Sequence, residues 1–461
     1  MAAIVTQHFR MRAAKQFIDE VKAAANSHYL WVGRGEPWAT DTTPDVPYDN
    51  TFYHTNDVWQ RMQSLKKVSG TSDITFAAPR YQWISGTTYA EYDDRDIALE
   101  SKKFYAITDN NHVMICIKAG SGASTTNPDN TGVQTAGVID FSSSDGYIWK
   151  YLFTLTTTAS SKFLTSAFIP VDFLAANPGG AAAQALQDQF SVQGSAINGG
   201  IHNIKVVTGG SGYSASDAFT VTINGDGTGA SVTDANVTVV SGVITNLKVT
   251  AAGSGYTKAK VTVTSDGSGS GCTARAVISP KGGFGADPRE DLRAHYATVS
   301  LTLTGAEGGD FVVGNEYRQL GLIRNPYAFG TTSGTTFASA TTMFAMYRLT
   351  VSTGSGAPNA SEFTNDATII GSATGALGII DTYDATNGII YYHQTETTGY
   401  TAFTTSDNVK ISGSANTARD VTAIGNPEVQ PNSGEVIFME NRTSVLRAAD
   451  QSEAVKLVLE F

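Results

Sequence analysis

A short pattern occurs twice between residues 199 and 280, and it limits what this part of the chain can form. Asn203-Ile-Lys-Val leads to Gly-Ser-Gly-Tyr213, and Asn246-Leu-Lys-Val leads to Gly-Ser-Gly-Tyr256. Each copy is typical of a strand that ends in a tight turn, because glycine adopts positive φ at no steric cost. We therefore predict a small β-domain of two similar hairpin units, with Tyr213 and Tyr256 covering the turns.

A second region, from about 331 to 425, has the same Gly-, Ser- and Thr-rich composition. Within it, Asn387-Gly388 stands between two apolar runs, which is the strongest short signal for a β-hairpin. Surface loops tolerate long insertions at a modest entropic cost. We therefore interpret 199–280 and 331–428 as two β-modules inserted into loops of a larger scaffold.

The remaining segments, 1–198, 281–330 and 429–461, form that predicted scaffold. They are rich in β-branched and aromatic runs bounded by Gly, Asn and Asp, as strands are. Helices are expected only at Arg10–Asn26, after Asn56 and after Asp287, where a cap, a proline and an acid follow one another. The predicted fold is mainly β: a layered antiparallel β-sandwich with a few short helices and the two inserted modules.

The C-terminal end predicts a docked strand. Val455–Phe461 alternates apolar and polar residues, so Val455, Leu457, Leu459 and Phe461 would share one buried face. A second run, Val436–Met439, precedes it, and Glu440-Asn441-Arg442 would begin the polar link between the two strands. Packing at a terminus normally prevents fraying, so the end would be held in the scaffold.

Charge and cysteine content exclude several classes of protein. The 461 residues carry 31 Lys and Arg against 42 Asp and Glu, a net charge of −11, and no basic cluster is evident. Such a chain repels nucleic acid and anionic membranes. Cys116 and Cys272 are too few and too far apart for a disulfide framework or a CxxC metal site, which fits a reducing cytosol. The N-terminal segment lacks a signal-peptide core, and no run is long enough to span a membrane.

Each motif that could bind a ligand or catalyse a reaction is better explained as a turn or a surface loop. Gly282–Asp287 matches GGxGxD, a calcium-binding repeat of β-rolls, but it occurs once. The other Gly-rich pieces lack phosphate-loop spacing, and the histidines show no metal-ligand spacing. Asp93, Asp94 and Asp96 could hold a cation or serve as an acid–base pair, yet neighbouring acids are more typical of a solvated turn or an interface rim. The sequence predicts no enzyme, no cofactor and no metal.

Aromatic residues concentrate in the N-terminal third, in Tyr29–Trp38 and Asp145–Phe153. Core packing explains about half of these rings, but Trp, Tyr and Arg also dominate protein interfaces. For the polar C-terminal link, a turn satisfied within the monomer is as good an explanation as a partner contact. The candidate interface residues are Trp31, Glu36, Pro37, Trp38, Trp59, Tyr147, Trp149, Glu440, Asn441 and Arg442.

Six segments in order resemble the baseplate wedge protein of T-even-like contractile phages, the gene product eight family. They are Val32–Trp38, Asn56–Trp59, Ala78–Trp83, Asp145–Phe153, Tyr317–Pro326 and Gly434–Arg442. The resemblance covers about residues 4–175, 285–330 and 430–461, whereas both Gly-rich regions depart from the family pattern. It implies an all-β scaffold that acts as a homodimer in each wedge, with neither enzymatic activity nor cofactor.

This resemblance predicts a structural protein of the virion, made in the host bacterial cytoplasm, that couples baseplate rearrangement to sheath contraction. Its partners would be itself, other wedge proteins and tail-fibre attachment proteins. Two alternatives stay open. A receptor-binding or glycan-binding tail protein could use the inserted modules for carbohydrate, although Asp226 and Asp266, in Gly-rich turns, do not suit a pair of cleaving carboxyls. A capsid decoration protein is the third possibility.

Overall fold

The computed structural model describes residues 4–48, 51–129, 141–334, 336–353 and 359–461. Strands account for 39% of the chain and helices for 13%, in several antiparallel sheets, which confirms a mainly β fold. Two compact units are present: Met1–Lys15, Thr75–Thr298 and Val458–Phe461 form the first, and Gln16–Ile74 and Val299–Leu457 the second. The chain therefore passes between the units at three strands and one helix, namely β3 (Ile74–Pro79), β17 (Tyr296–Thr304), β27 (Ser452–Glu460) and α1 (Gln7–Lys22).

The scaffold of the first unit centres on a four-stranded sheet of order β4-β5-β7-β6. Its strands are β4 (Tyr105–Ile107), β5 (His112–Lys118), β6 (Phe141–Ser142) and β7 (Ile148–Thr154). Tyr147 stacks on Trp149 at a centroid distance of 5.8 Å, and Tyr89 meets Trp149 edge-on at 5.2 Å. Strand β3 pairs antiparallel with β8 (Phe168–Val171), with Phe76 opposite Val171.

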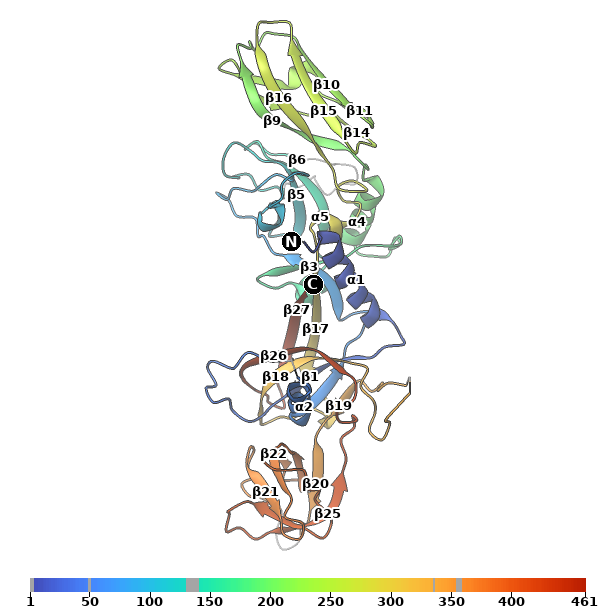
Figure 1. Cartoon of the computed structure of the whole chain (residues 1–461), viewed down its shortest axis with the longest axis vertical. Helices are drawn as coiled ribbons and strands as arrows, with labels where there is room; N and C mark the ends of the chain where they lie inside the picture. Colours follow the sequence, from blue (N-terminus) through green and yellow to red (C-terminus); the bar gives the residue numbers. More distant parts are fainter. Residues whose placement is uncertain (1–3, 49–50, 130–140, 335, 354–358) are drawn as a thin grey trace. The chain divides into compact units, whose positions relative to one another are not determined.

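The duplicated pattern forms eight strands, drawn green to yellow in Figure 1. Six of them make a sheet of order β10-β15-β16-β9-β13-β12, and β11 pairs with β14. Tyr213 and Tyr256 are buried at equivalent places, where their hydroxyls accept the Cys272 and Ala230 N–H groups at 3.2 and 3.3 Å. This confirms the predicted turn covers. The prediction of two hairpin units was wrong, because the strands on either side of each Gly-Ser-Gly turn do not pair: β9 pairs with β16 and β13 rather than β10, and β14 pairs with β11 rather than β15. The strands are β9 (Ile201–Ser211), β10 (Phe219–Gly225), β11 (Thr228–Ser231), β12 (Val237–Val240), β13 (Val243–Leu247), β14 (Ala251–Ser254), β15 (Ala259–Ser265) and β16 (Ser270–Ile278).

Asp93 of the acidic cluster anchors this module, so the interpretation as a solvated turn or rim was wrong for Asp93, whereas Asp94 is exposed and Asp96 is half-buried. Asp93 is only 5% exposed. Its carboxylate is paired with the Arg275 guanidinium of β16 and lies 3.3 Å from the Lys205 ammonium of β9. Glu91 adds a second contact to Lys205 at 2.9 Å. A buried carboxylate needs such partners to offset its desolvation.

The second unit contains a five-stranded sheet of order β19-β2-β1-β18-β26. Trp31 on β1 and Leu65 on β2 are opposite each other in register, and both are fully buried. Helix α2 (Phe52–Gln60) adds Val58 and Trp59 to the same core. The strands are β1 (His28–Gly33), β2 (Met62–Lys67), β18 (Glu316–Arg324), β19 (Thr342–Phe344) and β26 (Glu435–Leu446).

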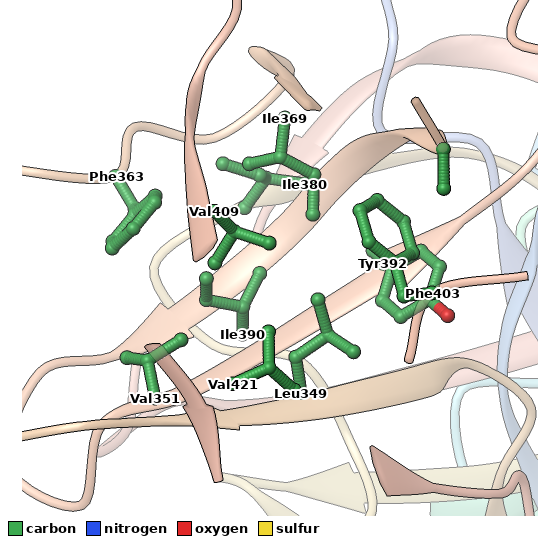
Figure 2. Close-up of a cluster of buried hydrophobic side chains, with 11 residues drawn as sticks. Leu349, Val351, Phe363, Ile369, Ile380, Ile390, Tyr392, Phe403, Val409 and Val421 are labelled. Atoms are coloured by element: carbon green, nitrogen blue, oxygen red, sulfur yellow. The ribbon is translucent and has the colours of Figure 1, made fainter. Parts of the chain in front are cut away.

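The second Gly-rich region closes into a barrel of order β20-β23-β22-β21-β24-β25, drawn orange to red in Figure 1. Apolar side chains from every strand fill it, and Figure 2 shows Tyr392 beside Phe403 among them. The Asn387-Gly388 turn joins β22 to β23, as predicted. Closure leaves no free strand edge in this module. The strands are β20 (Tyr347–Val351), β21 (Thr368–Gly371), β22 (Leu377–Asp384), β23 (Ile389–His393), β24 (Asn408–Ile411) and β25 (Arg419–Gly425).

Helices form near all three predicted places, but the second was misplaced: α2 spans Phe52–Gln60 and so begins before Asn56, and Met62 and Leu65, expected on its apolar side, lie in strand β2. The first helix ends at Lys22 rather than Asn26. It begins at Gln7 rather than Arg10, because the Thr6 hydroxyl accepts the Phe9 N–H and caps the first turn. The third is confirmed as α5 (Pro288–Asp291), where the Asp287 side chain caps Arg289 N–H. Two helices escaped prediction, α3 (Thr157–Phe163) and α4 (Gln184–Ser195), and short 3-10 turns lie at Leu99–Ser101, Asp234–Asn236 and Glu307–Gly309.

The C-terminal strand β27 forms as predicted, but its burial is incomplete. Val455 and Leu457 are 7% and 4% exposed, whereas Leu459 and Phe461 are half-buried. The prediction of one fully buried face was therefore wrong for the last two positions. The preceding strand also runs further than expected: β26 continues to Leu446, so Glu440–Arg442 lie within a strand and the link is Arg447–Gln451.

Candidate binding site

A pocket of about 460 Å³ lies in the second unit. Helix α2 supplies one wall, the barrel strands β20, β23 and β25 supply others, and the loops at 400–403 and 426–432 complete it. Small-molecule sites in proteins commonly have volumes of ~300–1,000 Å³. The pocket is therefore large enough for a small ligand.

Five aromatic side chains line this pocket: Trp59, Tyr347, Tyr392, Tyr400 and Phe403. Tyr392 is packed edge-on against Phe403 at 5.1 Å and lies 6.0 Å from the Tyr347 ring. Both Tyr392 and Phe403 are 3% exposed, so the core of the barrel fixes their positions. Tyr400, by contrast, is 60% exposed and stands at the rim. The result is a preformed aromatic wall with one accessible ring.

Five amide side chains share the lining: Asn56, Gln60, Gln394, Asn426 and Asn432. Gln394 is fixed, because its amide donates to the Leu377 and Thr401 carbonyls at 2.7 and 2.8 Å. The side chains of the other four form no hydrogen bond with another residue that the structure describes. Their donors and acceptors are available to a ligand.

One wall of the pocket is backed by a buried polar network around His393, the last residue of β23. The His393 Nδ1 is 2.8 Å from a carboxylate oxygen of Asp381 on β22. Its Nε2 is 3.2 Å from Glu36, which follows β1. Gln63 on β2 donates to the other Asp381 oxygen at 3.0 Å, and the Arg61 guanidinium lies 3.6 Å from Glu36.

The charges of this network stabilise one another. Burial alone would lower the pKa of His393, but the charge and hydrogen bonds of Asp381 and Glu36 outweigh it and raise that pKa to about 10. Burial would raise the pKa of Glu36, yet its hydrogen bond to His393 and the positive charges nearby lower that pKa to about 2. At neutral pH, His393 is a cation held by two carboxylates. Both of its nitrogens are occupied, so it offers no free group for acid–base chemistry.

Four of the predicted interface residues belong to hydrophobic cores. Trp31, Tyr147 and Trp149 have no exposed surface, and Trp59 is 7% exposed and lines the pocket. Side chains this deeply buried contribute to packing and have no surface to offer to a partner. These four residues therefore pack in the core, as the first of the two interpretations of the aromatic residues predicts.

The other predicted residues lie in the second unit, and most of them converge. The Trp38 indole N–H donates to the Arg442 carbonyl at 2.9 Å, across a sequence separation of 404 residues. Asn441 donates to the Asp45 carbonyl and accepts from Gln319. Glu36, in contrast, points into the His393 network. We name Pro37, Trp38, Glu440, Asn441 and Arg442 the β26 surface; all five side chains are half-buried or exposed.

Sequence reasoning missed His393 and Asp381, the centre of the buried network. A signal existed in the apolar run Ile389–Tyr392, which ends in a histidine, and in Asp381 within the run Gly378–Tyr383. Charged residues inside strand patterns that are otherwise apolar need a buried partner. The partner Glu36 is 357 residues away from His393 in sequence, so the pairing could not be read from a local pattern.

Neither a metal cluster nor a membrane-spanning helix is present among the residues that the structure describes. No group of three or more His, Cys, Asp or Glu side chains there could hold a metal ion. No helix in the described ranges has the length and apolar character needed to cross a membrane. No protein-family model matches the chain, and neither does any curated protein.

Proposed function

We propose that this chain is a structural subunit of the baseplate wedge of a contractile phage tail. In that role it would bind a second copy of itself and neighbouring wedge or fibre-attachment proteins, and would transmit baseplate rearrangement to the sheath. It would act by binding alone, within the virion, after synthesis in the bacterial cytoplasm. The proposal rests on the resemblance of six sequence segments.

One observation carries this proposal: three of those segments form neighbouring strands. Val32–Trp38, Tyr317–Pro326 and Gly434–Arg442 contribute to β1, β18 and β26, and β18 pairs with both of the others. The segments are also joined by side chains. Arg318, 5% exposed, donates to the Gly35 carbonyl, and Trp38 donates to the Arg442 carbonyl. Segments that depend on one another in this way support a family resemblance better than scattered matches do.

The β26 surface is the best candidate for the two-fold contact. Strand β26 is the last strand of its sheet, and an edge strand presents unpaired backbone groups to another chain. A two-fold axis places the same patch on both copies, so each substitution removes two contacts. The Arg34 guanidinium lies 3.9 Å from the centroid of the Trp38 ring and orders that side chain from one face.

Labelling of purified phage tails tests where in the virion the protein lies. An antibody against the 199–280 module should bind at the baseplate rim in negative-stain images. Label at fibre tips would favour a receptor-binding protein, and label on the head would favour a capsid decoration.

Sedimentation tests the dimer. The purified chain should sediment near twice 48.6 kDa. The double variant E440A/R442A should dissociate at a concentration at least tenfold higher. Tyr48→Ala, an exposed position outside the β26 surface, is the matched control. A monomer at micromolar concentration would contradict the two-fold assembly.

A further inference from the structure

The pocket described above has a composition that selects the chemistry of its ligand, and this inference goes beyond a structural role. We infer that it binds a neutral saccharide unit, with the ring stacked on the aromatic wall and the hydroxyl groups bound by the amides. The site would be a small-ligand site within the second unit, independent of the dimer contact.

The first step is that the pocket lining offers no free charge to a ligand. No Lys, Arg, Asp or Glu is among the described residues that line it. His393 is the one cationic side chain in the wall, and its two nitrogens are already engaged by Asp381 and Glu36. An anionic ligand would therefore lose its hydration without gaining a counter-charge, and a cationic one likewise. Phosphorylated, carboxylated and ammonium ligands are disfavoured.

The second step is the pairing of rings with amides. A sugar ring has an apolar face of C–H groups and an edge of hydroxyl groups that both donate and accept hydrogen bonds. Tyr400 offers an accessible ring, and Tyr347 extends the aromatic wall. Asn56, Gln60 and Asn426 offer side chains that also both donate and accept. The lining therefore matches both the apolar face of a sugar ring and its hydroxyl edge.

The third step distinguishes a saccharide from an extended peptide. Peptides that bind β-proteins commonly add a strand to a free sheet edge. The strands that line the pocket, β20, β23 and β25, are each paired on both sides within the closed barrel. Backbone pairing is therefore not available at this wall, and recognition must use side chains.

Saturation-transfer NMR on the full chain tests the inference, using methyl glycosides of neutral hexoses and N-acetylhexosamines as probes. We expect at least one of them to bind, and methyl glucuronide and glucosamine to bind at least tenfold more weakly. N-acetyltryptophanamide serves as the peptide-like probe. Binding of this amide without any neutral glycoside, binding of the charged sugars equal to that of the neutral ones, or no saccharide signal at tens of millimolar would overturn the inference.

Matched substitutions locate the site. Tyr400→Ala and Asn426→Ala should each weaken glycoside binding by roughly five- to tenfold, since each removes one exposed contact of about 1 kcal/mol. Tyr48 is 58% exposed against 60% for Tyr400, and Asn416 is an exposed asparagine of the barrel away from the pocket. Tyr48→Ala and Asn416→Ala should leave binding unchanged. Equal effects of the pocket and control substitutions would refute the assignment, whatever the location of the protein in a tail.

Discussion

Replacing Glu36 by Gln should loosen the barrel of the second unit. The amide keeps the shape of the side chain and can still hydrogen-bond, but it removes one of the two negative charges that hold the His393 imidazolium. That cation is buried, with 5% of its side chain exposed, and Glu36 itself is 18% exposed. Removing one partner of a buried ion pair costs ~3–5 kcal/mol in proteins, and this is an upper bound here because Asp381 remains beside His393.

The pKa of Glu36 gives a second estimate. Its fall from 4.5 to about 2 corresponds to about 3 kcal/mol, since one pKa unit is ~1.4 kcal/mol. Because this pKa is depressed in the folded state, its contribution is present above pH 4.5 and is lost as the pH falls towards 2. The pKa of His393 is raised to about 10, so its contribution is complete below pH 6.5 and is lost as the pH rises through 10. The substitution should therefore cost most between pH 4.5 and 6.5.

Hydrogen exchange can measure this change in the barrel separately from the other unit. At pH 6, amides of β22 and β23 should exchange roughly a hundredfold faster in Glu36→Gln than in the wild type, the factor that about 3 kcal/mol implies. Asp450→Asn, an exposed acid in the same unit, is the control and should change nothing. Equal exchange in the two variants, or an effect that does not shrink at pH 9.5 and above, would refute the ion-pair reasoning.

Three further perturbations have defined outcomes. Burial raises the pKa of Asp291 to about 8, so its ionisation costs stability as the pH rises from about 4 to 8; Asp291→Asn should raise the melting temperature at pH 8 and leave it nearly unchanged at pH 4. Gly269→Ala would place a Cβ 2.2 Å from the Tyr213 ring and should destabilise the duplicated module by ~1–3 kcal/mol in urea unfolding, whereas Gly122→Ala meets open space and should be neutral. Asp93→Asn should expose 201–278 to faster proteolysis, because Lys205 and Arg275 lose their buried counter-charge; unchanged proteolysis would show that apolar contacts alone hold the module.

Local patterns predicted much of the strand content. The duplicated Gly-Ser-Gly-Tyr pattern, the Asn387-Gly388 hairpin and the Asp287 cap each depend on residues close in sequence, and each is present in the structure. Element ends were less predictable. Strand β26 continues through Glu440–Arg442 because β18 pairs with it there, and such a long-range partner overrides the polar composition of the segment.

Side-chain roles were harder to predict than strands. Composition could not separate Trp38, which is half-buried beside Arg442, from Trp31, which is fully buried in the same unit. Aromatic residues serve both cores and surfaces, so only their burial distinguishes the two. The pocket was missed for a related reason: its lining comes from α2, three barrel strands and two loops, and no single segment carries more than a few of the residues.

The β9–β16 region and the β20–β25 barrel each depend on charged side chains for part of their attachment. Asp93 of the first unit pairs with Lys205 and Arg275 of the duplicated module, and Glu36 of the second unit binds His393 of the barrel. An apolar joint would tolerate sliding, whereas a buried ion pair is favourable only in one geometry, because a displaced partner leaves a desolvated charge. Such contacts fix the orientation of a module without a large interface. The wedge subunit proposed above would need joints of this kind, since a module that could shift at low cost would absorb the displacement instead of passing it on.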